Sequence, residues 1–227
     1  MKVAKRILFV VLILFFAGVI VVGGIVLNKV VKIASNLSLN TEALMEATTK
    51  IDMFDKYNDL INDETSKKAL VKLEELPKYV PASFVSIEDK KFYTHHGLNY
   101  KRMVKAMFNN FVSGSMKEGA STISQQLIKN THLSTEKTLD RKIKEILLVK
   151  QLEKVFSKQQ ILETYLNVIY FGNGSYGLES ASHNFFNKSA KDLTLSESAT
   201  LASIIKSHGV CSRIGSRKNK PSYSNFR

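Results

Sequence analysis

Two adjacent carboxylates, Glu88 and Asp89, end an apolar run within residues 82–97. A histidine and a glycine, His95 and Gly97, follow them closely. An acid beside an apolar segment, with histidine close by, is suited to proton-transfer chemistry. The alternative is a helix end that carries a solvated acidic pair, and on this stretch alone that interpretation is favoured. The choice depends on the residues that follow.

A second polar cluster opens a predicted helix over residues 120–130, after a loop rich in Gly and Ser. Hydroxyl and free N–H groups at a helix N-terminus suit an anionic or sugar ligand. Ordinary capping by Ser121 or Thr122 explains the hydroxyls without the glutamine pair. The cluster comprises Ser121, Thr122, Ser124, Gln125, Gln126 and Lys129.

Cations gather near the start of a predicted long helix over residues 133–154. Arg141 and Glu145 are four residues apart, and an exposed pair of this kind contributes only about 0.3–0.5 kcal/mol. Taken alone, a surface ion pair is the default interpretation. The alternative is a cationic cradle for a phosphate group. Its members would be Lys129, Lys137, Arg141 and Lys142.

Composition and charge narrow the classes of partner. The 227 residues carry a net charge of +13 and are 44% hydrophobic, so the chain is globular and favours an anionic partner. Nucleic acid, a lipid headgroup surface and a phosphorylated substrate are the three candidates. A single cysteine, Cys211, excludes an internal disulfide and a cysteine metal cluster.

Residues 7–27 form an uncharged run of 21 residues. At about 1.5 Å per residue this run spans a hydrocarbon layer of about 30 Å. It is longer than a signal-peptide core of about 7–15 residues, and no A-x-A site follows, so we expect an uncleaved single anchor. Lys2, Lys5 and Arg6 precede it and favour a cytoplasmic N-terminus with the remainder outside the cell membrane.

The remaining elements are mostly helical. A helical stalk is expected over residues 30–47, a short strand near residues 51–54, and helices over residues 66–76, 80–91, 158–167, 178–186 and 194–206. The helix predicted over residues 100–112 is amphipathic, with Lys101, Arg102 and Lys105 between its apolar positions. It either faces the core or dips into a membrane surface with a basic face on lipid headgroups.

Four blocks in order resemble peptidoglycan glycosyltransferase family 51, the polymerase domain of class A penicillin-binding proteins and monofunctional transglycosylases. EDKKFYTHHG at residues 88–97 fits E-D-x-x-F-x-x-H-x-G, and GASTISQQLIKN at residues 119–130 fits G-x-S-T-x-x-Q-Q. RKIKE at residues 141–145 fits R-K-x-x-E, and KQQILETYLNVIYFG at residues 158–172 fits the I-L-E-x-Y-L-N block. The similarity runs from about residue 76 to about residue 206.

The resemblance implies a mostly α, lysozyme-like fold with a membrane-associated small lobe at residues 100–117. It implies an enzyme that joins lipid II into glycan strands, with the growing strand as donor and undecaprenyl pyrophosphate as leaving group. The chain is similar to enzymes that are commonly assisted by Mg²⁺ or Mn²⁺, although nothing in the sequence alone requires a cofactor. Implied partners are lipid II, the growing strand, membrane lipids, and proteins of cell-wall synthesis or division.

The resemblance also implies residue roles. Glu88 would be the general base on the acceptor hydroxyl, Asp89 an organiser of its surroundings, and Glu145 the second essential glutamate. The pyrophosphate would be held by cations, and the donor cleft lined by hydroxyl and amide groups. The candidate substrate-binding set is Asp89, Ser121, Thr122, Gln125, Gln126, Lys129, Lys137, Arg141, Lys142 and Asn167.

The chain departs from the family pattern after residue 207. We expect an anchor at residues 1–28, a stalk at 29–75, the glycosyltransferase domain at 76–207 and a divergent basic tail at 208–227, from a truncated or frame-shifted C-terminus. Alternatives are a catalytically impaired scaffold that binds lipid II, and a lysozyme-type enzyme that cleaves glycan with Glu88 as acid. The cations argue against cleavage, since hydrolysis has no pyrophosphate to neutralise. An exported, anchored domain argues against a nucleic-acid partner.

Overall fold

The computed structural model describes residues 2–49, 53–54, 60–61, 70–114, 119–134, 136 and 138–214. The mostly α fold class predicted from the sequence is confirmed. The helices are α1 (Lys2–Ser35), α2 (Thr41–Thr49), α3 (Tyr79–Glu88), α4 (Tyr100–Ser113), α5 (Ile123–His132), α6 (Leu139–Val155), α7 (Lys158–Val168), α8 (Leu178–Phe186) and α9 (Leu195–Ile214). Short 3-10 helices lie at Leu73–Glu75 and Ala190–Asp192.

Two antiparallel strand pairs accompany the helices. Strand β1 (Met53–Phe54) pairs with β2 (Leu60–Ile61), which agrees with the short strand expected there. Strand β3 (Tyr170–Gly172) pairs with β4 (Ser175–Tyr176) across the Gly-rich turn. Both pairs are too short to form a layer of their own, so the helices supply most of the core, with Phe171 of β3 and loop residues such as Phe92 and Leu98 added to it.

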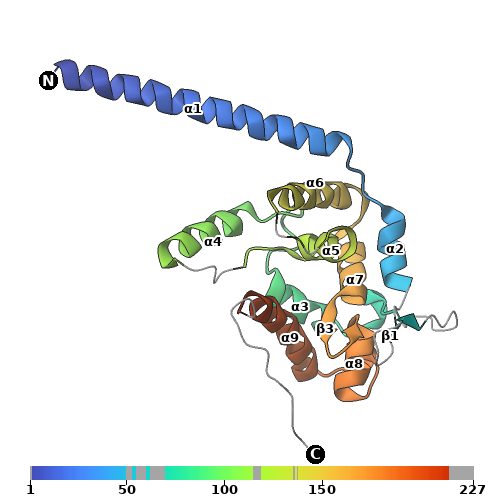
Figure 1. The fold of residues 1–227 in the computed structure, drawn as a ribbon. Coiled ribbons are helices and arrows are strands. Elements are labelled where there is room, and N and C mark those ends of the chain that lie inside the picture. Colours follow the sequence, from blue (N-terminus) through green and yellow to red (C-terminus); the bar gives the residue numbers. More distant parts are fainter. Residues whose placement is uncertain are drawn as a thin grey trace, which may run out of the picture.

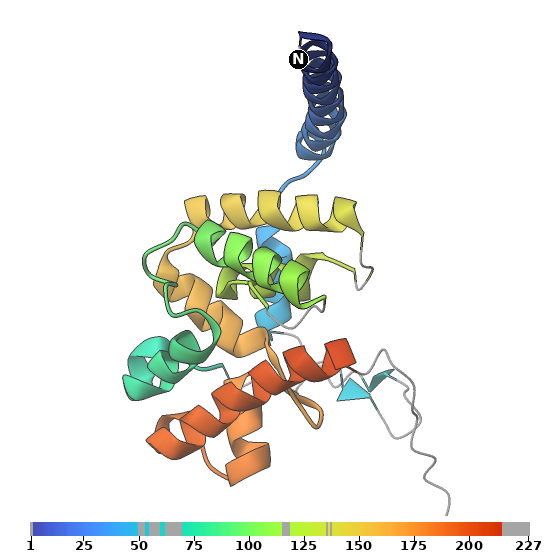
Figure 2. The same ribbon diagram turned by 90° about the vertical axis from the view of Figure 1, so that its left-hand side faces the viewer.

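The helical body has an upper part formed by α5 and α6 and a lower part formed by α3, α8 and α9, with α7 between them (Figure 1, Figure 2). Helix α3 packs along α9, and α5 packs against α6 and α7. Phe84 and Phe171 meet edge to face with ring centroids 5.9 Å apart. Each such fully buried large side chain stabilises the fold by about 1.5–3 kcal/mol relative to exposure.

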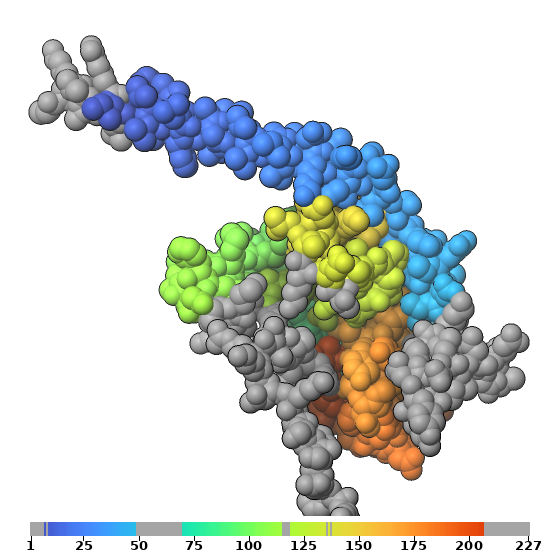
Figure 3. All heavy atoms as spheres, in the orientation of Figure 1, coloured from blue at the N-terminus to red at the C-terminus, as the bar shows by residue number. Residues whose placement is uncertain are grey.

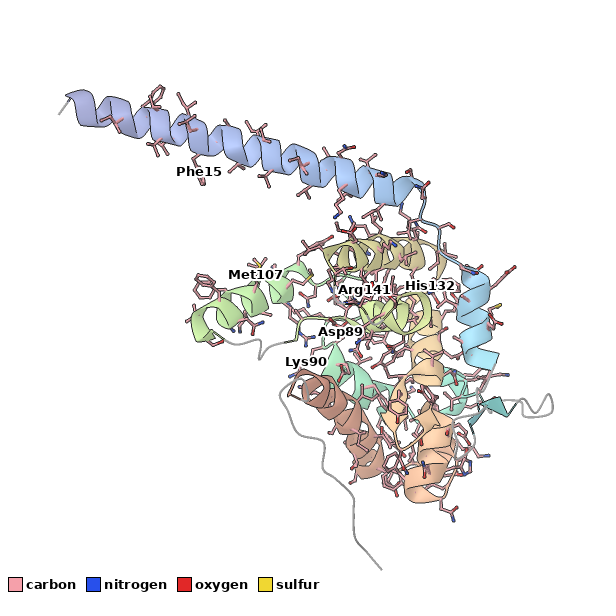
Figure 4. All side chains as sticks on the ribbon, viewed as in Figure 1. Phe15, Asp89, Lys90, Met107, His132 and Arg141 are labelled. Atoms are coloured by element: carbon pink, nitrogen blue, oxygen red, sulfur yellow. The ribbon has the colours of Figure 1, made fainter. Side chains whose placement is uncertain are left out.

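Helix α1 is long and apolar enough to cross a membrane over Phe9–Ser35. Its apolar side chains from Phe9 to Leu27 are exposed, and Figure 4 shows Phe15 projecting from the helix into open space. The helical stalk expected over residues 30–47 is interrupted, because residues 36–40 are not helical. Helix α2 then packs against α5 and α7 and buries Leu44 to 3% exposure.

The segment between α1 and α2 is held to the body by side chains of α5 and α6. Gln151 Nε2 donates to the Leu37 carbonyl oxygen over 3.1 Å, and its Oε1 accepts from the Leu39 N–H over 2.7 Å. His132 Nε2 lies 3.0 Å from the Asn40 carbonyl oxygen. The segment is therefore docked along its length.

Several predicted helix bounds shift. Helix α3 ends at Glu88 rather than residue 91, and α6 begins at Leu139 rather than residue 133. The helix expected over residues 66–76 lies partly outside the described residues; residues 70–72 are not helical and only the 3-10 turn Leu73–Glu75 follows. Predictions for α7 and α8 agree with the structure to within one residue.

The apolar side of α4 faces outward. Figure 3 shows α4 as a lobe that stands out from the body, and Figure 4 shows Met107 pointing away from it. Among the residues of α4, Ala106 alone is buried, so the interpretation as a core-facing helix is wrong. The exposed apolar residues are Val104, Met107, Phe108, Phe111 and Val112.

Candidate active site

Glu88 is the last residue of α3, and its carboxylate points into the body with 9% of the residue exposed. Its Oε2 accepts a hydrogen bond from Gln126 Nε2 over 2.7 Å. Its Oε1 is buried and has no hydrogen-bond partner among the described residues. One oxygen is therefore fixed while the other keeps its acceptor capacity for a proton.

Asp89 leaves the helix with φ −152° and ψ 73° and is fully buried. Its Oδ2 accepts from His95 Nε2 over 2.9 Å and from the Ile123 N–H over 3.1 Å. Ile123 is the first residue of α5, where the backbone N–H groups lack helical partners and favour a negative charge. Asp89 thus ties the end of α3 to the start of α5, in the interior position labelled in Figure 4.

The start of α5 is a capping box between Thr122 and Gln125. The Gln125 N–H donates to Thr122 Oγ1 over 3.2 Å, and Gln125 Oε1 accepts from the Thr122 N–H over 3.1 Å. Thr122 Oγ1 also donates to the Gly97 carbonyl oxygen over 2.6 Å. Ordinary capping therefore accounts for Thr122 and also for half of the Gln125 amide, which the sequence interpretation had left unexplained.

Glu145 is buried in α6, with 2% of the residue exposed. Its Oε1 accepts from Gln125 Nε2 over 2.8 Å and pairs with Lys142 Nζ, while Arg141 Nη1 lies 3.6 Å from Oε2. The interpretation of Arg141 and Glu145 as a surface pair is wrong, because helix packing buries the carboxylate. A buried charge of this kind needs such partners, since an unpaired one costs several kcal/mol.

The two glutamates are thereby bound by neighbouring residues of one helix, Glu88 by Gln126 and Glu145 by Gln125. Tyr165 extends this arrangement, because its hydroxyl donates to Gln126 Oε1 over 3.2 Å. Burial, together with the charges of Glu88 and Asp89, raises the pKa of Tyr165 well above its usual value. Tyr165 therefore stays a neutral donor.

The polar contact of Tyr165 was not predicted from the sequence. The available signal was its place in the ILETYLN block, where it shares a face with other buried residues of α7. Arg102 was missed in the same way. Its guanidinium donates to the carbonyl oxygens of Glu88 and Gly119, over 2.7 and 3.0 Å.

The other candidates lie in different settings. Lys129 is exposed in the last turn of α5, and Ser121 is half-buried just before the N-cap. Lys137 lies outside the described residues. The Asn167 amide bonds to the backbone of Val71, accepting from N–H and donating to C=O, each over 2.9 Å. This amide is committed to holding the chain, so we do not carry Asn167 into the proposed site.

Within the described ranges, no three His, Cys, Asp or Glu side chains gather in a way that could hold a metal ion. Glu88 and Asp89 are adjacent in sequence, but Asp89 Oδ2 already accepts from His95 Nε2 and from the Ile123 N–H. These residues alone do not fit a resident metal site. Mg²⁺ or Mn²⁺ stays a prediction from the resemblance, and we derive no step through it.

Comparisons with known proteins identify the family of the chain. The chain matches the family model described as Transglycosylase over residues 55–222, and so belongs to that family, glycosyltransferase family 51 of class A penicillin-binding proteins. The match extends beyond residues 76–206, the range of the resemblance, at both ends. The resemblance found in the sequence is therefore confirmed.

Individual relatives are longer proteins. The chain is 46% identical over 150 residues to penicillin-binding protein 1F of Bacillus subtilis (strain 168), covering 66% of this chain and 21% of that protein. It is 40% identical over 195 residues to penicillin-binding protein 1A of Clostridium tetani, covering 82% and 25%. It is 40% identical over 205 residues to penicillin-binding protein 1A/1B of Bacillus subtilis, covering 89% and 22%. The chain thus spans a quarter or less of the length of these curated relatives.

Proposed function

We propose that this chain is a membrane-anchored peptidoglycan glycosyltransferase that polymerises lipid II into glycan strands and releases undecaprenyl pyrophosphate. The observation that carries the proposal is the state of Glu88. Its carboxylate is oriented through one oxygen by Gln126, while the other oxygen is buried without a partner among the described residues. That arrangement suits a base that must take a proton at one defined place.

In the proposed reaction, Glu88 Oε1 accepts the proton of the acceptor sugar hydroxyl as that oxygen attacks the anomeric carbon of the donor. The new C–O bond forms while the bond from that carbon to the pyrophosphate oxygen breaks. The bonding pair leaves with the pyrophosphate. Holding the carboxylate in one orientation favours this step, because general-base catalysis requires hydrogen-bond reach to the proton being removed.

Departure of a pyrophosphate requires positive charge nearby. Lys142 and Arg141 are held close to one another by the buried Glu145. Arg141 Nε is buried and has no hydrogen-bond partner within the described part of the chain. We assign these two cations, together with Lys129 and Lys137, to the leaving group, with Glu145 orienting the pair. Guanidinium and ammonium groups bind phosphate through charge-assisted hydrogen bonds.

A lipid-borne substrate requires the site to stand at a bilayer. Helix α1 runs above the body, and its free N-terminal part extends toward the same side as α4, the left in Figure 1 (Figure 1, Figure 2). We propose that α1 crosses the membrane with its N-terminus in the cytoplasm, and that the exposed apolar side of α4 enters the outer surface of the same bilayer. Phe111 and Met107, with 85% and 70% of their surface exposed, would be buried in lipid.

Polymerisation of lipid II by the full chain in detergent tests the proposal. Glu88→Gln should lower kcat by about 10²–10⁴-fold, the usual contribution of a general base. Glu145→Gln should also lower kcat, and Glu74→Gln, which removes an exposed carboxylate of the 3-10 turn Leu73–Glu75, should not.

The same assay distinguishes the alternatives. Shortening of finished glycan strands, without polymer, would support a lysozyme-type hydrolase. Retention of lipid II without polymer would support a scaffold that binds the substrate. Polymer formed equally well by Glu88→Gln would contradict the assigned base.

A further inference from the structure

Arg102 lies in the first turn of α4, and its guanidinium is directed toward the body. Nη1 donates to the Glu88 carbonyl oxygen over 2.7 Å, and Nη2 donates to the Gly119 carbonyl oxygen over 3.0 Å. The Arg102 N–H is itself held by Asn99 Oδ1 over 3.0 Å. One side chain therefore joins the end of α3, the start of α4 and the segment that leads into α5.

These contacts suit arginine specifically. Glu88 is the last residue of α3, where helix carbonyl groups lack helical partners and favour a cation. The planar guanidinium presents donors in a fixed fork, so it can serve two carbonyl groups in a defined geometry. A lysine keeps the charge but concentrates its donors on one nitrogen. Replacement by lysine should therefore preserve the charge but lose the paired hydrogen bonds to the Glu88 and Gly119 carbonyl oxygens.

The rest of α4 is weakly seated in the protein. Only Ala106 among its residues is buried, and its apolar side is exposed. An amphipathic helix of this kind gains stabilisation when lipid covers its apolar side. Lipid that covered this side would therefore stabilise α4 in one position. Arg102, in the first turn of the same helix, contacts the Glu88 carbonyl oxygen.

We propose that Arg102 is a positioning residue that couples the seating of α4 in lipid to the position of Glu88. This inference rests on the proposed function and deepens it. With α4 in the bilayer, its first turn is fixed, and the guanidinium holds the Glu88 main chain while Gln126 holds the carboxylate. Without lipid, the Glu88 backbone loses that restraint.

A headgroup contact is the competing role, because Arg102 shares its helical turn with basic residues on a membrane-facing helix. The geometry disfavours it. Both Nη atoms donate to backbone carbonyl oxygens, whereas Lys101 and Lys105 are exposed. Charge alone would satisfy a headgroup, so a lysine at position 102 separates the two roles.

The first experiment measures polymerisation of lipid II by the full chain in vesicles of phosphatidylcholine and phosphatidylglycerol. Arg102→Lys and Arg102→Ala should both lower kcat on the order of a hundredfold with little change in KM, as expected when a catalytic group is misplaced by about 1 Å. Lys191→Ala removes an exposed charge from the 3-10 turn Ala190–Asp192 and should behave as the parent chain does. Full activity of Arg102→Lys would overturn the proposal.

A second measurement needs no catalysis. The chain contains no tryptophan, so the indole emission of a Phe111→Trp variant reports the seating of α4 alone. Amide exchange over residues 86–90 should be slower in vesicles than in detergent. In Arg102→Lys that difference should vanish, although the indole emission still shifts to the blue.

The two measurements separate the possible failures. If amide exchange over residues 86–90 in vesicles were as slow in Arg102→Lys as in the parent chain, the proposed coupling would be overturned. Absence of polymer from the parent chain, with exchange still dependent on Arg102, would remove the proposed function and leave the coupling supported.

Discussion

Gln126 Nε2 lies 2.7 Å from Glu88 Oε2, and this contact sets the orientation of the proposed base. Gln126→Met keeps the length of the side chain and removes the donor, so the carboxylate should turn away from its position. We expect kcat for lipid II polymerisation to fall about a hundredfold, the scale associated with a 1 Å misplacement. Turnover assays on the full chain measure this, and circular dichroism checks that the fold is retained. An unchanged kcat would contradict the orienting role.

Two equivalent capping boxes provide a matched comparison of stability. Gln125 and Gln160 occupy the same N3 position in α5 and α7, but only Gln125 also donates to a buried glutamate, Glu145. Replacement of Gln160 by Ala should lower the free energy of unfolding by about 1 kcal/mol, the usual value of a capping contact. Gln125→Ala should lower it by about 1–3 kcal/mol more, because a buried acceptor loses its donor. Denaturant titration of both variants gives the difference, and equal losses would count against the Gln125–Glu145 bond.

Gly97 and Gly114 both have positive φ, at +80° and +61°, but differ in their surroundings. A Cβ at Gly97 would lie 2.5 Å from Val149 Cγ1, whereas nothing lies within 4 Å of a Cβ at Gly114. Gly114→Ala should therefore cost only the backbone strain of about 1–2 kcal/mol. Gly97→Ala should cost about 1–3 kcal/mol more, because α6 must shift to admit the methyl group. Equal unfolding free energies for the two variants would show that the α6 contact yields without cost.

Glu197 gives the chain a pH-dependent contribution to stability. A hydrogen bond from Lys188, followed by those from the Thr194 N–H and hydroxyl, lowers the pKa of Glu197 from 4.5 to about 2. Because the pKa of Glu197 is lowered, its carboxylate stabilises the folded state fully at pH values above the ordinary pKa of 4.5. That stabilisation is lost as the pH falls from 4.5 toward about 2. Glu197→Gln should therefore be less stable than the parent chain at neutral pH, and the difference should narrow below pH 4.5.

Thermal unfolding at a series of pH values measures this narrowing. Asp192→Asn removes an exposed carboxylate from the neighbouring 3-10 turn Ala190–Asp192 and controls for the change in net charge. A Glu197→Gln difference that stays constant down to pH 2 would contradict the lowered pKa of Glu197.

The sequence predicted those features whose signals lie within a few residues of one another. Helix α8 was expected over its observed bounds, and helix α7 was expected to begin where it does, at Lys158. The order of the four blocks predicted the family. These signals are local, because helical periodicity and capping connect residues three or four apart.

Contacts between distant segments could not be predicted in this way. The bonds from Gln126 to Glu88 and from Gln125 to Glu145 join residues on different helices, so they depend on how α5 packs against α3 and α6. The same packing buries Glu145, which looked like half of a surface ion pair. Arg102 was grouped with lipid-facing lysines, since its spacing along α4 says nothing of which carbonyl groups its guanidinium reaches.

The docked segment between α1 and α2 has a mechanical consequence. The Gln151 side chain forms hydrogen bonds with the backbone of Leu37 and Leu39, and Lys29 Nζ of α1 lies 2.5 Å from Asp140 Oδ1 of α6. These contacts restrain rotation of the domain about the α1 axis. A lipid-anchored molecule in the same bilayer would then meet α4 on one side of that axis.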